Sequence, residues 1–197
     1  MQTPPPALEL RRRGAPVYLR PPRRRDAAAF LAAVAASRGL HRNWVVAPAT
    51  AAAYAAYVSR AAGPASRDPA RARHVAFLLC RVDDDTPAGV FNLSEIVRGA
   101  FHSAYLGYYG FTPHSGRGLM AEGMALVLHA AFRVLRLHRV EANVQPSNLR
   151  SVALVRGAGF TCEGYSPRYL KIAGRWRDHE RWAILAEDWR ARQRRPR

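Results

Sequence analysis

Apolar and polar residues along the chain recur at two spacings, one typical of helices and one typical of strands. The longest helical pattern runs over residues 119–137, with apolar positions on one face and polar or charged positions on the other. Strict alternation, as in residues 139–144, predicts a strand. These patterns predict helices over residues 26–37, 51–61, 119–137 and from 146–148 to 157–159. They predict strands over residues 17–20, 73–82, 89–97, 101–111, 139–144 and 176–185, with two further strand segments at 160–163 and 168–172.

The order of these elements predicts the fold class. Three successive strands between residues 73 and 111, joined by short turns, predict an antiparallel meander. The helix over 119–137 then joins two strands, and such a step implies a parallel pair with a right-handed crossover. We therefore expect an α+β fold: a mixed, mostly antiparallel sheet of about seven strands with a parallel central pair and four helices.

The length of 197 residues fits a single domain with terminal extensions. We expect the folded domain over residues 15–189. A Pro-rich and then basic segment at residues 1–14 predicts a flexible arm, and a basic run at 190–197 predicts a disordered tail.

The formal net charge of +17 comes almost wholly from arginine, because Lys171 is the only lysine. This charge favours an acidic partner such as RNA, a ribosome or a polyphosphate cofactor. A bias of composition towards Arg, Ala, Pro and Gly explains it equally well. No apolar run reaches the roughly 18 residues of a membrane span, and no signal-peptide core is present, so we expect a cytoplasmic protein with no membrane partner. Cys80 and Cys162 lack metal-ligand spacing, which predicts two reduced core thiols and no metal site.

The segment from Pro113 to Gly123 is the first candidate site. It joins a predicted strand to the longest predicted helix through a turn that contains Gly116 and Gly118. The first N–H groups of a helix have no helical partner, and the helix dipole favours an anion there. The spacing fits neither the P-loop nor the dinucleotide fingerprint. Taken alone, the segment predicts either a phosphate site or a plain strand-to-helix connection.

Further motifs narrow this choice by their order and spacing along residues 16–186. The motifs are Gly89-Val90-Phe91-Asn92-Leu93-Ser94, Val97-Arg98-Gly99, Tyr105-Leu106-Gly107-Tyr108, Gly116-Arg117-Gly118-Leu119-Met120, Pro146-Ser147-Asn148, Gly159-Phe160, Glu163-Gly164-Tyr165 and Trp176-Arg177-Asp178-His179. In this order they resemble the GNAT family of acetyl-CoA-dependent N-acetyltransferases. Within that family the chain is most similar to the RimJ/RimL branch, which acetylates N-terminal amines of ribosomal proteins.

The resemblance implies acetyl-CoA as the acetyl donor and names three groups of residues that would bind it. Backbone N–H groups of the turn would hold the pyrophosphate. The end of the preceding strand would bind the pantetheine arm as an added strand does. Two side chains would face the cofactor near its sulfur. The three groups are Ser115, Gly116, Arg117, Gly118, Leu119 and Met120; Tyr109, Gly110 and Phe111; and Asn148 and Ser151.

The implied reaction is direct attack of a neutral amine on the thioester in a ternary complex. It needs a proton acceptor, donors to the carbonyl oxygen and an acid for the leaving thiolate. The resemblance gives Ser151 as the acid, or else as a residue that only hydrogen-bonds the cofactor. Backbone N–H near Tyr109 or Gly110 would polarise the carbonyl. Glu95 and Tyr108 are candidate bases.

Other candidates remain open beside these. His114 or a bound water would also serve as the base, and Tyr165 and Tyr169 are rival acids. Asn92 and Trp176 are candidates for the lining of the acceptor cleft.

The acceptor that the resemblance implies is a protein or peptide N-terminus, with a ribosomal protein as the family's example. One alternative is a small-molecule amine in the same fold. Another is a non-catalytic ribosome- or RNA-binding module. The basic arms at both ends would add a weak electrostatic contact with a ribosome or RNA.

Overall fold

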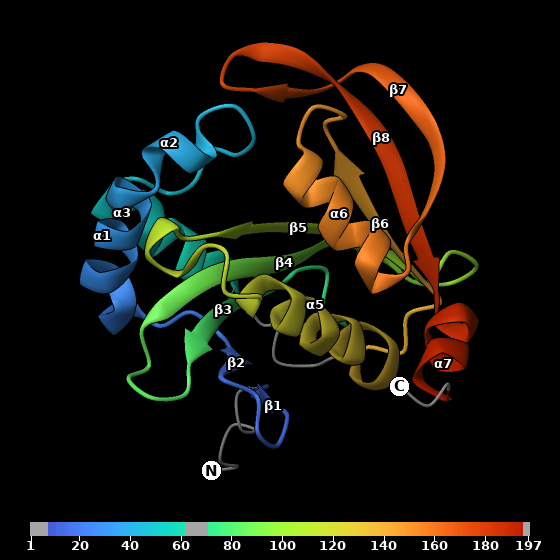
Figure 1. Cartoon of the computed structure of the whole chain (residues 1–197), viewed down its shortest axis with the longest axis horizontal. Helices are drawn as coiled ribbons and strands as arrows, with labels where there is room; N and C mark the ends of the chain where they lie inside the picture. The colour runs from blue at the N-terminus through green and yellow to red at the C-terminus, as the bar shows by residue number, and fades with distance from the viewer. Residues whose placement is uncertain (1–7, 62–70, 195–197) are drawn as a thin grey trace.

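The computed structural model describes residues 8–61 and 71–194, and this part of the chain forms one eight-stranded sheet between two layers of helices (Figure 1). The strand order is β1-β2-β3-β4-β5-β6-β8-β7. The strands are Leu10–Arg11 (β1), Val17–Arg20 (β2), Val75–Arg81 (β3), Pro87–Val97 (β4), Ser103–Gly110 (β5), Arg139–Val144 (β6), Thr161–Ile172 (β7) and Arg175–Leu185 (β8).

The predicted meander and parallel pair are both confirmed. Strands β3, β4 and β5 pair antiparallel in sequence order. β5 and β6 pair parallel across the crossover helix. The α+β fold class is therefore confirmed, with eight strands in the described part instead of about seven.

One strand differs from its prediction. The two segments expected at 160–163 and 168–172 form the single strand β7, which runs along β8 with register shifts between Cys162 and Gly164 and between Ser166 and Leu170. These β-bulges carry the strand through Gly164 and Pro167, residues that normally interrupt a regular ladder. The result is a long β7–β8 hairpin that extends well beyond β6 (Figure 1).

The four predicted helices are present, and the described residues contain two more. The predicted ones are Ala27–Ala36 (α1), Ala51–Ala61 (α3), Leu119–His129 (α5) and Leu149–Ala158 (α6). α5 ends earlier than the expected 137, because the chain continues as a π-helical stretch, Ala130–Val134 (η3). Short 3-10 helices lie at Arg24–Asp26 (η1) and Thr112–His114 (η2). The helices missed by the pattern are Arg38–His41 (α2) and Ala186–Arg194 (α7).

Both terminal extensions are more structured than expected. In the N-terminal arm, Leu10 and Arg11 form β1, which pairs with Leu19 and Tyr18 of β2. The Arg11 guanidinium also lies 3.8 Å from the centroid of the Tyr18 ring, an attractive cation–π arrangement. At the other end, α7 extends the ordered chain to Arg194. Residues 1–7 and 195–197 lie outside the described residues.

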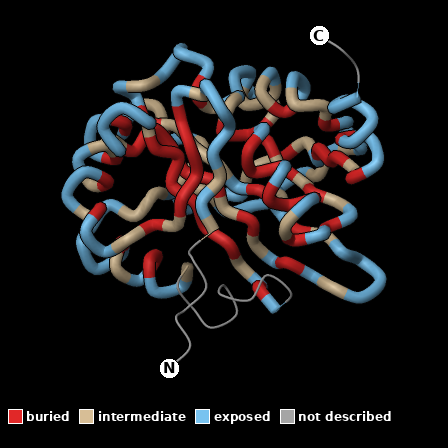
Figure 2. The backbone as a smooth tube through the Cα atoms, turned by 90° about the horizontal axis from the view of Figure 1, so that it is seen from below, coloured by how far each residue is buried: buried red, intermediate tan, exposed pale blue. Residues whose placement is uncertain are grey.

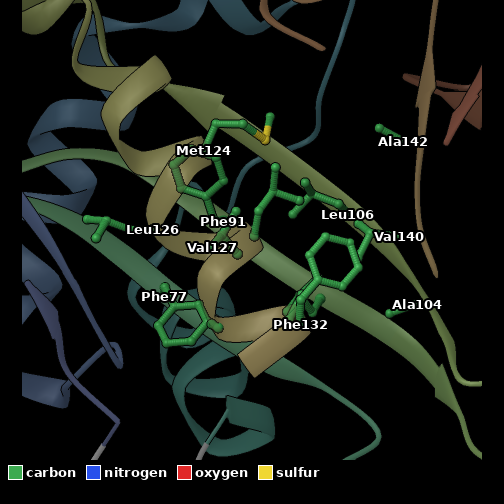
Figure 3. Close-up of a cluster of buried hydrophobic side chains, with 14 of the residues drawn as sticks. Phe77, Phe91, Ala104, Leu106, Met124, Leu126, Val127, Phe132, Val140 and Ala142 are labelled. Carbon is green, nitrogen blue, oxygen red and sulfur yellow. The ribbon is translucent and has the colours of Figure 1, made fainter. Parts of the chain in front are cut away.

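Two apolar clusters hold the helices on the two faces of the sheet. The first, under α5 and α6, contains Phe77, Phe91, Met124, Phe132 and Val140, and Figure 3 shows these side chains between α5 and the strands. The second joins α1 and α3 to the other face. Buried backbone is concentrated in the central strands between these layers (Figure 2).

The two cysteines do not share an environment. Cys80 is buried in the second apolar cluster, as expected for a core thiol. The expectation was wrong for Cys162, which is exposed on β7 because this strand lies at the edge of the sheet.

An ionic cluster fixes the start of the domain beneath α1. Arg20 is only 1% exposed, and its Nη1 lies 2.7 Å from Asp26 Oδ2 while its Nε lies 2.9 Å from Asp85 Oδ1. Tyr18 donates its hydroxyl to the same Asp85 oxygen at 2.5 Å. These bonds satisfy a buried guanidinium that would otherwise be costly. They tie β2 to η1 and to the β3–β4 turn.

Within the described ranges, none of the helices combines the length and the apolar character that a bilayer crossing requires.

Candidate active site

The central feature of the site is the separation of β5 from β6. These strands pair at only three positions, from Ser103 with Arg139 to Tyr105 with Glu141. Beyond Tyr105, β5 continues along β4 as far as Gly110, whereas β6 continues along β8. Among the described residues, the β6-facing edge of β5 therefore has no strand partner after Tyr105, and Figure 1 shows the two strands separating. An open strand edge offers backbone donors and acceptors to an extended ligand.

Backbone alternation decides which groups of β5 face this open edge. The Phe111 N–H donates to Ala88 O on the β4 side at 3.0 Å. Neighbouring residues of a strand turn their groups to opposite sides, so the N–H groups of Gly110 and Tyr108 point towards the opening. The Gly110 carbonyl already has a partner there, because His41 Nε2 lies 2.8 Å from it. A carbonyl only accepts, so the His41 Nε2 carries the hydrogen.

The glycine turn before α5 has the geometry of an anion site. Gly116 and Gly118 have φ values of 77° and 73°, a left-handed conformation that glycine adopts without strain. A Cβ added at either glycine would meet nothing within 4 Å, so the space above this turn is open. The helix begins directly at Leu119, and its first N–H groups have no helical partners. An anion placed there would also be favoured by the helix dipole.

Positive charge surrounds the same turn. Burial, together with the charges of Arg81 and Arg117, lowers the pKa of His114. The His114 Nδ1 is buried and has no partner among the described residues. Such an atom is costly to leave without one. The turn, the two arginines and this unpaired nitrogen fit a pyrophosphate group, which would neutralise the charges.

Met120 has a packing role at this turn. A Cβ added at Gly89 would lie 2.7 Å from the Met120 sulfur, and one added at Gly110 would lie 3.2 Å from Met120 Cγ. The two glycines therefore let the first turn of α5 sit directly on the ends of β4 and β5. The Met120 side chain fills the space between them, which leaves its backbone N–H for a ligand.

Two of the predicted catalytic residues contact each other. The Tyr108 hydroxyl lies 2.6 Å from Ser151 Oγ, where either group can donate. Burial raises the pKa of Tyr108 to about 12, although the Ser151 hydrogen bond opposes the shift. Asn148 caps α6, and its side-chain oxygen accepts the Ser151 N–H at 3.2 Å. The cap fixes the first turn of α6, so the pair lies beside the open edge of β5.

The structure does not bring Glu95 to this pair. Glu95 is exposed on β4, four residues beyond the partner of Tyr108, Phe91. Four residues of extended strand span about 13 Å. Glu95 also has a φ of 47° at a bulge that interrupts the pairing between Ser94 and Val97. The Glu95 charge instead acts on His74, where it partly offsets the burial that lowers the pKa of that histidine.

The remaining aromatic candidates lie on the β7–β8 hairpin. Tyr165 donates its hydroxyl to Asp178, and Trp176 is 61% exposed. Tyr165, Trp176 and Asp178 line a hollow of about 390 Å³ between the hairpin and the turn before α6. Tyr169 instead reaches Tyr105 on β5, and this hydrogen bond contributes most to raising the pKa of Tyr105 to about 12. In the described part of the chain the hydroxyls of Tyr165 and Tyr169 are thus engaged with Asp178 and Tyr105, and not with Ser151.

Sequence reasoning missed two residues that position the site. Ser37 is fully buried, accepts the Thr112 N–H at 2.9 Å and donates to Ala33 O at 2.7 Å. His41 holds the Gly110 carbonyl and lies edge-on to the Tyr109 ring. Ser37 stands at the end of the predicted helix over 26–37, and His41 lies in α2, which no apolar period marks. A buried polar residue gives no sequence signal of its position until the fold places it.

The comparisons with known proteins agree with this geometry. Residues 17–161 match the family described as the acetyltransferase (GNAT) domain, so the chain belongs to the GNAT acetyltransferase family. This family uses acetyl-CoA as its acetyl donor, and one structural neighbour, RimJ of Mycobacterium smegmatis, was solved with CoA-disulfide. That structure has a TM-score of 0.80 at 30% identity, covering 92% of this chain and 87% of that one.

Two further relatives belong to the branch that the sequence resembles. The [ribosomal protein uS5]-alanine N-acetyltransferase of Escherichia coli is 42% identical over 113 residues, which are 57% of this chain and 58% of that enzyme. The ribosomal-protein-S5-alanine acetyltransferase of Vibrio fischeri shares the fold, with a TM-score of 0.80 at 21% identity over 92% of this chain and 98% of that one. The chain spans less than two thirds of the length of the curated relatives it matches.

Proposed function

We propose that this protein is an acetyl-CoA-dependent N-acetyltransferase that acts on the N-terminal amine of a protein, with a ribosomal protein as the first candidate. The observation that carries the proposal is the open edge of β5, with the glycine turn at one end and the Tyr108–Ser151 pair beside it. The similarity to the uS5-alanine enzyme supports the acceptor class.

The donor's binding follows from the residues around the opening. Acetyl-CoA supplies an activated acetyl thioester. The turn from Ser115 to Met120 would hold its pyrophosphate, and Tyr109, Gly110 and Phe111 would line its extended arm. Asn148 and Ser151 would lie along the arm on its α6 side. Among these groups the Gly110 N–H faces the opening without a strand partner, so it is the donor best placed to polarise a carbonyl oxygen.

The proton for the leaving thiolate is assigned to the Tyr108–Ser151 pair. A phenol whose pKa is near 12 keeps its proton at neutral pH, so Tyr108 acts as an acid and not as a base. Ser151 lies within hydrogen-bonding distance and relays or shares that proton. Ser151, predicted as the acid, and Tyr108, predicted as a candidate base, therefore share the role of the acid in this proposal.

The amine attacks in its neutral form, and its proton leaves after or during the attack. With Tyr108 protonated and Glu95 remote, we assign this proton to water at the open edge. Glu95 would then affect the reaction only through long-range charge. The basic ends of the chain would add a salt-sensitive attraction for a ribosome or RNA.

The test is acetyl transfer to peptide pools with a fixed first residue. A pool of hexapeptides that begins with alanine and is random at the next five positions is compared with its N-acetylated counterpart and with spermidine, with thiol release as the readout. The proposal expects release only with the free-amine peptides, and mass spectrometry places the acetyl group on the first residue. Release with spermidine alone would contradict the protein acceptor, and no release with either would contradict the enzyme.

A further inference from the structure

We propose that the first residue of the acceptor binds above Gly107, on the face of the sheet opposite Tyr108, with its amine hydrogen-bonded to the side-chain oxygen of Asn143. This inference rests on the proposed function and places its amine subsite.

The first observation is open space at Gly107. A Cβ added to Gly107 would meet nothing within 4 Å, whereas one added at Gly89 or Gly110 would meet atoms at 2.7 or 3.2 Å. Gly107 has no left-handed φ, so its strand geometry does not require glycine. Its neighbours on the same face of β5 are Tyr105 and Tyr109, two large rings on either side of a bare backbone position. Gly107 is exposed, so an uncovered stretch of backbone lies between the two tyrosines.

The second observation is an unpaired acceptor on the neighbouring strand. Asn143 lies on β6 two residues beyond Glu141, the last residue that pairs with β5. Continuing this register places Asn143 beside Gly107, across the opening. Its Oδ1 is buried and has no partner among the described residues. A buried acceptor without a donor is costly, and an amine N–H is a donor that would satisfy it.

Two other polar groups around Gly107 already have partners. Asn92 is opposite Gly107 on β4, and its Oδ1 accepts the Tyr57 hydroxyl at 2.9 Å. The Tyr105 hydroxyl is engaged with Tyr169 of the hairpin. Among the described residues, Asn143 Oδ1 is the one buried side-chain oxygen without a hydrogen-bond partner.

The placement also explains how two substrates meet. Gly107 and Tyr108 are consecutive in β5, so their positions lie on opposite faces of the sheet. Tyr108 and Ser151 lie on the α6 side, and the space above Gly107 lies on the α1 side. An amine held from one face and a thioester held from the other reach each other through the gap between β5 and β6. Direct transfer requires both substrates to be bound at the same time, and separate entrances on the two faces allow this.

The test uses two kinds of variant. Gly107→Val fills the space with a residue that suits a strand. Asn143→Leu removes the acceptor, and Asn143→Asp restores an oxygen at the same place. Gly157→Ala on α6 is the matched control, because a side chain added there also meets nothing within 4 Å but lies on another element, away from Gly107 and Asn143. Each variant is checked for its melting temperature and for acetyl-CoA affinity by calorimetry, and kcat/KM is measured with the alanine hexapeptide pool.

The inference predicts that Gly107→Val and Asn143→Leu lower kcat/KM for the peptides at least tenfold, while acetyl-CoA affinity changes less than twofold. Asn143→Asp and Gly157→Ala should stay within threefold of the unaltered protein. Peptide turnover that survives both Gly107→Val and Asn143→Leu would overturn the subsite but leave the proposed function intact. If the unaltered protein binds acetyl-CoA and acetylates no peptide, both the proposed function and this subsite are overturned.

Discussion

The Tyr108 hydroxyl lies 2.6 Å from the Ser151 hydroxyl, and this contact joins the open edge of β5 to the first turn of α6. The two residues are 43 positions apart in sequence and belong to different elements, β5 and α6. Their contact forms where the cofactor's sulfur would lie, next to the gap between β5 and β6. A hydrogen-bonded pair of hydroxyls at this place is suited to passing a proton to a thiolate.

A double-mutant cycle tests whether Tyr108 and Ser151 act as one unit. Tyr108→Phe and Ser151→Ala should each lower kcat about 100-fold, a typical effect of removing an acid, with little change in the KM for acetyl-CoA. The double variant should be no worse than the poorer single variant, because both remove the same proton path. Fully additive losses would show two independent roles.

The pH dependence of kcat/KM for the peptide acceptor follows from the raised pKa of Tyr108. Activity should rise as the acceptor amine loses its proton, around a pKa of about 8. It should then stay level to pH 10, since Tyr108 keeps its proton until the pH approaches its pKa of about 12. An acid with the ordinary tyrosine pKa of 10.0 would be half lost at pH 10. A fall of half by pH 10 in the unaltered protein, absent in Tyr108→Phe, would contradict the assignment.

His41 should act through the backbone of Gly110. His41→Phe keeps a ring against Tyr109 and Phe111 but removes the hydrogen bond to the Gly110 carbonyl. We expect kcat to fall about tenfold through misplacement of the neighbouring N–H, since small displacements of a catalytic group are costly. His41→Gln, which retains a donor, should recover part of the loss. Equal activity of the Phe and Gln variants would show that only the ring packing matters.

The Arg20 cluster should be important for stability. Asp26→Ala removes one of the two carboxylates that pair with the buried Arg20 guanidinium, and breaking a buried ion pair costs about 3–5 kcal/mol in the free energy of unfolding. Asp83→Ala is the matched control, because its ion pair with Arg81 is solvent-exposed and is worth about 0.5 kcal/mol. Urea denaturation measures both values. Similar small losses for the two variants would contradict a structural role for the cluster.

The sequence predicted the elements that have a clear period and missed those that depend on a few contacts. Residues 17–20 and 139–144 were predicted with the exact bounds of β2 and β6, because each alternates within a packed sheet. α7 carries three arginines and two acidic residues, and its buried apolar residues are Ala186 and Trp189, too few to give a period. The hairpin strand β7 was divided in two because bulges do not alter composition in a recognisable way.

The residues of the candidate site show the same difference between a local sequence signal and a dependence on packing. The glycine turn was predicted from residues alone, since a turn before a helix has a physical meaning in sequence. Tyr108 and Ser151 became candidates only after the resemblance had implied the reaction. Their contact could be seen only in the fold. His41 and Asn143 could not be identified from the sequence. His41 is distinguished by its hydrogen bond to Gly110, and Asn143 by a buried oxygen without a partner among the described residues. Both features depend on packing between distant elements.

Calorimetric titration with acetyl-CoA is the most direct test of the central claim, that the turn before α5 binds the donor's pyrophosphate. Gly118→Asp places a negative side chain in the open space above the turn, and Gly118→Asn places a neutral one of the same shape at the same left-handed φ of 73°. We expect the unaltered protein to bind acetyl-CoA with micromolar affinity. The affinity should fall at least 30-fold in Gly118→Asp and less than fivefold in Gly118→Asn. Equal binding by all three proteins, or no binding by the unaltered one, would contradict this claim.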